Sequence, residues 1–579
     1  MKNFLTSCAG TMVGIILLFI LLIVYLTAVV SMEPPVVVED GSVLHIKLDK
    51  QITELEVDEP LAELLPTGDN SVGLVELRDA IRKAKDDSKI RGIYLNAPFV
   101  GAGFSTLDEV RKALEDFRAS GKWVVAYSNF YTEGGYYLST AADKIYMNPT
   151  GQLELNGLAI EVSFFKKLFD KLEIKPQVFR VGDFKSAVEP FIRENMSEEN
   201  RLQLTEMINS IHKHMLSELA KSRNLPEERL KEISDKMLVR DSKQAVEFGL
   251  LDSLYYDDQV KSELRERLGL DEKKTIPFVK YDDYRKTLDT KSSSKNEIAV
   301  IVADGDILPG KADRGVVGSA TIREQIRRAR TSDRVKAIII RVNSPGGAFP
   351  AADEMWREVY LASKVKPVIG SMGDYAASGG YYLAMACDTI VAQPNTITGS
   401  IGVFSVLFDL SDFLGDKLGI TSEQVKTGEV GDLITVTRPL TAQEKDIWQK
   451  QTDEVYEVFT SKAAQGRSMT QDEIKKVASG RVWTGSQALE RGLVDKLGSF
   501  DDAVTIAADA AGVGSDYQLR YYPKQKTFFE KLMSDYQDDV RVATLKKETG
   551  EYYRWFQQWE KIKHYQGMQA RMPVEFIIN

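Results

Sequence analysis

Histidine and cysteine are scarce in this chain, and this scarcity limits the chemistry it can perform. The four histidines and two cysteines are His45, His212, His214, His564, Cys8 and Cys387. No histidine lies in a glycine-rich turn, and the sequence holds neither an H-E-x-x-H motif nor a cysteine cluster, the usual ligand patterns of catalytic metals. We therefore expect no metal ion and no cofactor.

An excess of positive charge is also lacking. Lys and Arg number 75 against 85 Asp and Glu, so the formal net charge is −10, which argues against a nucleic-acid partner. The hydrophobic fraction of 43% and the charged fraction of 28% are ordinary for a globular protein. The 579 residues are enough for about two to four domains.

The N-terminal region has a long uncharged run, from Thr11 to Val30. At ~1.5 Å per residue, a helix of this length spans the ~30 Å hydrocarbon core of a bilayer. Lys2 precedes the run and acidic residues follow it, so the positive-inside bias places the N-terminus in the cytoplasm and the bulk of the chain outside. A cleaved signal peptide is the alternative, but the run exceeds a usual h-region and no A-x-A site follows it. We predict an uncleaved anchor within residues 1–32.

Most of the remaining chain consists of an internal duplication. Residues 374–383 read Asp-Tyr-Ala-Ala-Ser-Gly-Gly-Tyr-Tyr-Leu, and residues 131–138 read Tyr-Thr-Glu-Gly-Gly-Tyr-Tyr-Leu. The match continues at a constant spacing of 245 residues and places Ser378 opposite Glu133. A repeat of this length indicates a duplicated domain and not a solenoid.

The duplication divides the chain into five regions. We expect the membrane anchor (1–32), a first copy (33–284), a polar linker (285–297), a second copy (298–520) and a C-terminal helical tail (521–579). Within each copy, strand and helix patterns alternate; in the second copy, for example, strands are expected at 298–302 and 335–342 and helices at 321–330 and 351–363. The fold class is therefore α/β with parallel sheets and right-handed crossovers.

Ser378 is a candidate nucleophile. It lies between Ala377 and Gly379, and these small neighbours would let a substrate carbonyl approach. The following residues are typical of a helix, so its hydroxyl would be exposed beside free N–H groups. The alternative is an inert serine that caps the helix, and this stretch alone slightly favours the cap.

A glycine-rich loop, Asn-Ser-Pro-Gly-Gly over residues 343–347, follows an expected strand and precedes a helix. Its glycines, Gly346 and Gly347, would let backbone N–H groups point at a developing oxyanion. An ordinary strand-to-helix turn is the alternative. The first copy has Pro-Phe-Val-Gly-Ala-Gly there, at residues 98–103, which indicates that its own pocket has decayed.

Lys185 is the candidate base. Residues 178–185 align with residues 424–431, and the second copy has Gly431 where the first has this lysine. A lysine works as a base only if burial lowers its pKa from ~10.4 toward neutrality, and most lysines are solvated. Ser400, in Thr-Gly-Ser-Ile-Gly, could orient the lysine; a turn serine is the alternative. A serine in one copy and a lysine in the other predict one composite site.

These motifs together resemble the signal peptide peptidase A family, in its long, duplicated, membrane-anchored form. The resemblance rests on residues 398–403, the Ser-Pro-Gly-Gly loop, the Ala-Ala-Ser-Gly-Gly-Tyr-Tyr stretch and Gly-Asp-Phe-Lys-Ser-Ala at 182–187. It implies two Clp-protease/crotonase-like repeats and a Ser/Lys-dyad protease that degrades cleaved signal peptides. The roles it implies are the nucleophile for Ser378, the base for Lys185, lysine orientation for Ser400, and the oxyanion hole for Gly346, Gly347 and Gly379.

The resemblance also implies partners and a location. Peptide remnants of signal sequences would be the substrates, and the chain would form a homo-oligomer, expected to be a tetramer. It would be held in a bacterial inner membrane by one span, with the catalytic part in the periplasm.

Two rival functions remain. An acyl-CoA hydratase or isomerase on the same fold would use carboxylates such as Glu133, but such enzymes need no membrane anchor. A non-catalytic, membrane-anchored scaffold is the second rival. Such a protein would not need Ser378, Lys185, Ser400 or the Gly346–Gly347 loop.

Overall fold

The computed structural model describes residues 10–15, 17–18, 36–55, 71–288, 294–312, 315–523 and 567–572. Within these ranges, no helix is long and apolar enough to cross a membrane. Most of the expected anchor over 11–30 lies outside the described residues, as does most of the expected tail.

The first copy is built on a six-stranded sheet in the order β8-β6-β5-β4-β1-β9, with every neighbouring pair parallel. Buried strands rich in Val, Ile and Leu form it, as expected of a parallel sheet covered on both faces. The strands are β1 (Ser42–Lys47), β4 (Ile90–Asn96), β5 (Trp123–Ser128), β6 (Lys144–Met147), β8 (Ser253–Leu254) and β9 (Phe278–Lys280), beside a short pair β2 (Ile52–Thr53) and β3 (Val72–Gly73).

Helices cover both faces of this sheet. On one face α2 and α3 pack their apolar sides against β1 and β4, and on the other α10 packs against the same strands. The helices of this copy are α2 (Leu74–Asp86), α3 (Phe104–Arg118), α4 (Glu133–Ser139), α5 (Lys166–Leu172), α6 (Glu189–Ile192), α7 (Glu198–Arg223), α8 (Glu227–Asp235), α9 (Ser242–Glu247), α10 (Asp257–Leu268) and α11 (Tyr281–Tyr284).

The second copy repeats the design, with the sheet order β19-β17-β15-β13-β10-β21 and the strands β16 and β20 beside it. Its strands are β10 (Glu297–Asp304), β13 (Val335–Ser344), β15 (Val368–Ala377), β16 (Thr389–Ala392), β17 (Ile397–Gly399), β19 (Val482–Thr484), β20 (Lys496–Leu497) and β21 (Gln518–Tyr522). Its helices are α12 (Ser319–Thr331), α13 (Phe349–Ser363), α14 (Gly379–Ala384), α15 (Ala442–Arg467), α16 (Gln471–Val477), α17 (Gly485–Glu490) and α18 (Phe500–Ala510). The expected alternation of strands and helices is confirmed.

A third sheet joins the copies and the tail, in the order β12-β11-β14-β22-β18-β7. Its members are β7 (Lys175–Val181) of the first copy, β11 (Asp306–Leu308), β12 (Val316–Gly318), β14 (Gly346–Ala348) and β18 (Val403–Asp409) of the second copy, and β22 (Gly567–Arg571) of the tail. The expectation of a helical tail is wrong for β22, because its residues pair in a sheet with strands distant in sequence.

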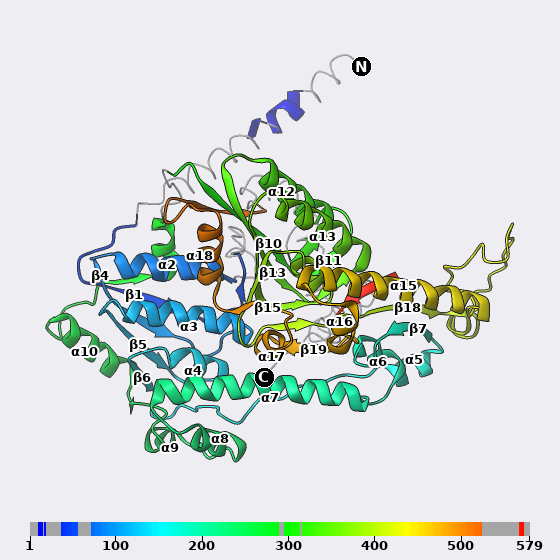
Figure 1. Ribbon diagram of the computed structural model, residues 1–579. Coiled ribbons are helices and arrows are strands. Elements are labelled where there is room, and N and C mark those ends of the chain that lie inside the picture. Colours follow the sequence, from blue (N-terminus) through cyan, green and yellow to red (C-terminus); the bar gives the residue numbers. More distant parts are fainter. Residues whose placement is uncertain are drawn as a thin grey trace.

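The two copies lie side by side, with the long helix α7 running across both (Figure 1). A buried charge cluster joins them: the Arg341 guanidinium in β13 donates to both carboxylate oxygens of Glu54 at 2.9 Å and lies 3.5 Å from Glu109. All three side chains are almost fully buried. At this cluster the seam between the copies is closed to water.

Candidate active site

Ser378 occupies a strained position between β15 and α14. Its φ is +55° and its ψ is −111°, a backbone conformation that side-chain-bearing residues rarely adopt and that is frequent at functional sites. The residue stands at the N-cap position, yet among the described residues its side chain accepts no hydrogen bond from the helix. The interpretation of Ser378 as a helix cap is therefore wrong, because its Oγ lies 2.8 Å from Lys185 Nζ.

Lys185 reaches this serine from the first copy. The strand β7 pairs antiparallel with β18 of the second copy. The chain then turns at Gly182 and brings the lysine to Ser378, which follows β15. The Lys185 side chain is fully buried, and this burial holds the pKa of its amine well below the usual value of 10.5. A neutral amine at hydrogen-bond distance from a hydroxyl can accept the hydroxyl proton.

Ser400 contacts the same amine. Lys185 Nζ lies 3.1 Å from both the carbonyl oxygen and the Oγ of Ser400. The position of Ser400 is fixed by its amide, which donates to the Arg481 carbonyl at 2.7 Å, and by its hydroxyl, which donates to the Gly480 carbonyl at 3.3 Å. The structure thus brings together Ser378, Lys185 and Ser400, the three side chains that the sequence singled out.

Gly480 is a site residue that the sequence reasoning missed. Its φ is +78°, and a Cβ at this position would lie 2.6 Å from the Cβ of Lys185. Only glycine lets the two backbones approach this closely. The available signal was an isolated glycine in a turn between α16 and β19, which is too common a pattern to stand out.

Two of the three glycines expected at an oxyanion hole, Gly346 and Gly379, border the carbonyl oxygen of Ala570, whereas the space at Gly347 faces the carbonyl oxygen of Ile307. Gly346 and Gly347 have φ values of +103° and +156°, a backbone conformation that residues with a side chain rarely adopt. A Cβ at Gly346 would lie 2.2 Å from the carbonyl oxygen of Ala570 and 2.8 Å from the amide nitrogen of Gly379. A Cβ at Gly379 would lie 3.1 Å from the same oxygen. Ala570 belongs to β22, a contact that nothing in the tail's sequence signalled.

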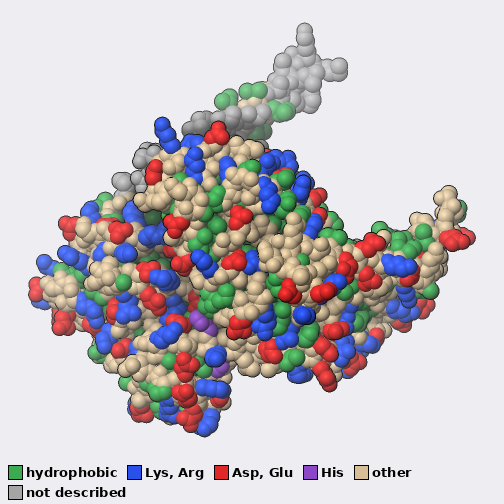
Figure 2. Space-filling view, in the orientation of Figure 1, with side chains coloured by type: hydrophobic (Ala, Val, Ile, Leu, Met, Phe, Trp, Pro, Cys, Tyr) green, Lys and Arg blue, Asp and Glu red, His purple; other side chains and the backbone are tan. Residues whose placement is uncertain are grey.

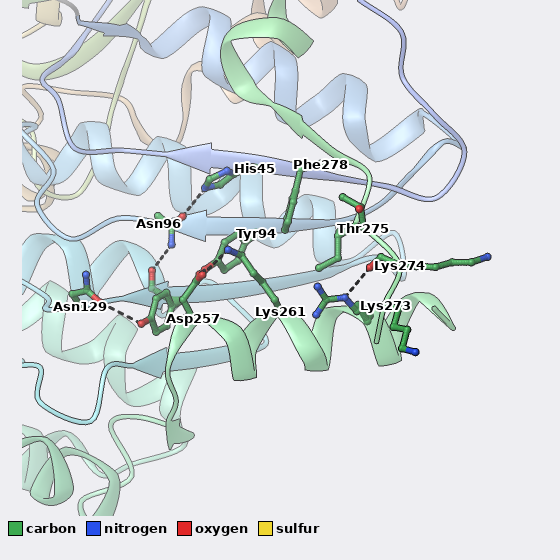
Figure 3. Close-up of a pocket in the computed structure, with 13 residues that line it drawn as sticks. His45, Tyr94, Asn96, Asn129, Asp257, Lys261, Lys273, Lys274, Thr275 and Phe278 are labelled. Atoms are coloured by element: carbon green, nitrogen blue, oxygen red, sulfur yellow. Dashed lines mark hydrogen bonds and ion pairs between the residues drawn. The ribbon is translucent and has the colours of Figure 1, made fainter. Parts of the chain in front are cut away.

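A large cavity lies away from this site. It measures about 590 Å³ and lies between α10 and the outer face of the first sheet (Figure 3). His45, Tyr94 and Asp257 line it, and no residue of the Ser378 site does. Chemistry is therefore better located by the Ser378–Lys185 contact than by cavity size.

Charge does not single out another site. Among the described residues, no group of three or more His, Cys, Asp and Glu side chains could hold a metal ion. On the face that Figure 2 shows, Lys and Arg are interspersed with Asp and Glu. The Ser378 site is the arrangement in the described structure to which a reaction can be assigned.

Comparison with known proteins identifies the family. The model of peptidase family S49 matches twice, at residues 116–271 and 361–514, once in each copy, which confirms the duplication. A solved structure, a mutant of ClpP1 from Listeria monocytogenes, is 14% identical over 36% of this chain and 95% of its own, with a TM-score of 0.24. A likeness at that TM-score adds nothing to the fold description.

Three relatives match most of the chain. The chloroplastic serine protease SPPA of Arabidopsis thaliana is 36% identical over 82% of this chain and 70% of its own length. Protease 4 of Salmonella typhi is 38% identical over 81% of this chain and 77% of its own, and Protease 4 of Haemophilus influenzae is 36% identical over 74% and 71%. The chain therefore belongs to peptidase family S49, in the signal peptide peptidase A family, and is a serine protease.

Proposed function

We propose that this protease is a Ser/Lys-dyad endopeptidase that degrades cleaved signal peptides and other unfolded apolar peptides. The observation that carries the proposal is the 2.8 Å contact between Lys185 Nζ of the first copy and Ser378 Oγ of the second, buried and with the lysine pKa lowered. A neutral lysine beside a serine is the arrangement that nucleophilic catalysis needs. Membership of a peptidase family argues against the hydratase and scaffold alternatives.

The proposed mechanism is acyl transfer. Lys185 accepts the proton of Ser378 as its Oγ attacks the peptide carbonyl, and the amides near Gly346, Gly347 and Gly379 stabilise the oxyanion. The lysine then gives the proton to the leaving amine, and water hydrolyses the acyl-enzyme. Ser400 keeps the amine aimed at Ser378 through its two 3.1 Å contacts.

The third sheet supports extended, apolar substrates. The strands β14 and β18 flank the strand position that β22 occupies, so a peptide that took the place of β22 would gain main-chain hydrogen bonds on both sides. Met568 of β22 packs there against an apolar cluster that includes Phe179, Leu407 and Trp448, so an apolar substrate side chain at the same place would make the same contact. Folded proteins offer few such free strands, which favours unfolded peptides.

The location and assembly are part of the proposal. The uncharged run over 11–30 would anchor the chain in a bacterial inner membrane, N-terminus in the cytoplasm and both Clp-protease/crotonase-like copies in the periplasm. Association of several copies, expected as a tetramer, is supported by residues 418–436 at the far right of Figure 1, where Val425 and Ile434 are exposed. This segment includes the counterpart of β7, yet it pairs with no strand among the described residues.

The proposal is tested by hydrolysis of a fluorogenic peptide with an apolar residue before the scissile bond. The anchor-less protein is compared with Ser378→Ala and Lys185→Ala across pH, with circular dichroism to verify folding. We expect both variants to be folded and inactive. Near-normal activity in Lys185→Ala would refute the dyad, and an inert wild type would refute the proposed function.

A further inference from the structure

The outer faces of the two central sheets differ, although the copies share one design. In the second copy α18 packs on aliphatic strand residues, among them the paired Val300 and Ile339, which are fully buried. In the first copy the equivalent pair on the central strands is His45 and Tyr94, and a cavity of about 590 Å³ lies between this face and α10 (Figure 3). A cavity of this volume is typical of small-molecule sites.

Three rings from neighbouring strands form one wall of the cavity. His45 lies in β1, Tyr94 in β4 and Phe278 in β9. The centroid of the His45 ring lies 5.1 Å from that of Tyr94 and 5.7 Å from that of Phe278. His45 and Phe278 are only half-buried, so part of each ring is open to the cavity. A continuous aromatic surface of this kind favours a ligand with a planar ring.

Positive charge gathers at the end of the cavity formed by α10 and the loop after it. Of the charged residues in the lining, Lys261 is ion-paired with Asp257, the one acid among the described residues that line the cavity. Arg265 of α10 and Lys273 and Lys274 of the loop have no ion-pair partner in the described part of the chain. Three neighbouring cations in a chain with a net charge of −10 favour an anion with more than one negative charge.

The loop and the helix hold these cations in place. Arg265 Nε donates to the Lys274 carbonyl at 2.9 Å, which ties the loop to α10, and the two Nη groups of the guanidinium have no hydrogen-bond partner among the described residues. The side chains of Lys273 and Lys274 are exposed at the rim, where they are free to turn toward a bound anion. The guanidinium presents a fork of donors that suits a phosphate group.

Two amide side chains lie at the carboxyl ends of the strands, where parallel sheets commonly bind ligands. Asn96 is the last residue of β4, and its Oδ1 accepts from His45 Nε2 at 2.6 Å, which fixes the imidazole in the wall. Asn129 directly follows β5 and is exposed, and its Oδ1 accepts from the Tyr127 hydroxyl at 3.2 Å. The Asn129 Nδ2 group has no hydrogen-bond partner among the described residues, so it can donate to a polar ring edge.

We propose that this cavity binds a phosphorylated small molecule that carries a planar ring, the chemistry of a nucleotide. The ring lies against His45 and Phe278, and the phosphate groups accept hydrogen bonds from Arg265 and from the two lysines at the rim. The site shares no lining residue with the Ser378 site, and the inference does not rest on the proposed protease function.

Calorimetric titration of the full-length protein in detergent, with ADP as the probe, tests the proposal. Adenosine supplies the ring without the anion, and pyrophosphate supplies the anion without the ring. We expect ADP to bind at least about tenfold more tightly than either half, because ring contact and charged hydrogen bonds each contribute to its affinity. ADP binding no tighter than pyrophosphate, or no saturable ADP binding below about 1 mM, would overturn the proposal.

A matched pair of variants on α10 tests the charge. Arg265→Gln removes the cation from the cavity, whereas Arg267→Gln makes the same change at an arginine that is paired with Glu263 and does not line the cavity. We expect ADP binding to weaken by about tenfold in Arg265→Gln and to stay unchanged in Arg267→Gln. Circular dichroism and hydrolysis of the fluorogenic peptide verify that both variants are folded. Equal affinities in the two variants would overturn the assignment of Arg265.

Photochemical labelling locates the site independently of affinity. The wild type and Phe278→Leu, which keeps an apolar side chain but removes the ring, are irradiated with 8-azido-ADP and digested for mass spectrometry. We expect the label within residues 257–278 of the wild type, and about tenfold less of it in Phe278→Leu at a subsaturating probe concentration. Labelling confined to other segments, or equal labelling of both proteins, would contradict the proposal.

Discussion

The two copies begin the same helix in different ways. In the first copy Thr132 caps α4 by accepting from the Gly135 amide at 3.3 Å, and Glu133 is the first helical residue. In the second copy Ser378, the counterpart of Glu133, stands before α14 with a positive φ. The proposed nucleophile thus stands in strained backbone, whereas the copy that lacks this serine begins the same helix with an ordinary cap.

The candidate lysine, by contrast, is present in the first copy and absent from the second. The first copy has β7, which is paired with β18 and followed by Lys185. The counterpart in the second copy, residues 421–427, is exposed and forms no described strand. Each copy therefore supplies one member of the proposed dyad, and the shared third sheet brings the two residues together.

The largest effect is expected from moving the serine to the other copy. In the double variant Ser378→Ala/Glu133→Ser, the new serine lies in the copy that lacks the Ser-Pro-Gly-Gly loop, and the second copy has Gly431 where a matching lysine would be. The new hydroxyl should therefore restore no activity. We expect kcat/KM to fall by about 10³-fold or more, as for loss of a nucleophile. The measurement is peptide hydrolysis, with Glu133→Ser alone as the active control. Rescue above the level of Ser378→Ala would contradict the account of the first copy as decayed.

A second comparison concerns Arg341 and its counterpart Asn96. Arg341 donates to both carboxylate oxygens of Glu54 in the first copy, whereas Asn96 Oδ1 accepts from His45 Nε2 at 2.6 Å beside the cavity. Arg341→Ala leaves the Glu54 carboxylate buried without its guanidinium, so we expect a loss of about 3–5 kcal/mol in the free energy of unfolding. Urea titration measures it, with Asn96→Ala as the milder control. Equal losses in both variants would contradict the claim that the Arg341–Glu54 pair stabilises the fold more than the Asn96–His45 contact does.

Gly480 tests whether the lysine must be held closely. A Cβ there collides with the Cβ of Lys185 and meets a left-handed φ. We expect Gly480→Ala to lower kcat/KM by about 10- to 100-fold through displacement of the amine, a loss of roughly 1.4–2.7 kcal/mol of transition-state stabilisation. Gly431→Ala, at the lysine's counterpart in the second copy, is the control. Unchanged activity in Gly480→Ala would mean that the amine tolerates movement.

The smallest effect concerns the acid opposite the nucleophile. Burial raises the pKa of the Glu133 carboxyl from 4.5 to about 7. The folded protein then binds more protons than the unfolded chain between these values, so stability falls as pH rises from 4.5 to 7. We expect the free energy of unfolding of Glu133→Gln to exceed that of the wild type by on the order of 1–2 kcal/mol at about pH 8, and to differ little from it at about pH 4. A pH-independent difference in thermal unfolding would contradict the pKa shift.

The sequence predicted the local parts of this molecule better than the distant contacts. Helices α12 and α13 and strands β10 and β13 lie close to their expected bounds, because their periodicity is local. Ser378 and Lys185 were found because the repeat exposed a difference at aligned positions. The β22 pairing was missed because it depends on strands far away in the chain, and Gly480 was missed because its constraint is the close approach of Lys185.

The central claim is that Lys185 activates Ser378 across the two copies, and covalent labelling tests it most directly. A fluorophosphonate that bonds to the serine hydroxyl is reacted with the wild type and with Lys185→Ala, and the rate is followed by mass spectrometry between about pH 5 and 10. The account predicts a wild-type rate that rises with pH to a plateau, with a midpoint well below the usual 10.5 of lysine, because the amine must be neutral to accept the proton. Lys185→Ala should react at least about 100-fold more slowly, as expected for loss of a general base. Equal rates and equal pH profiles in the two proteins would contradict the claim.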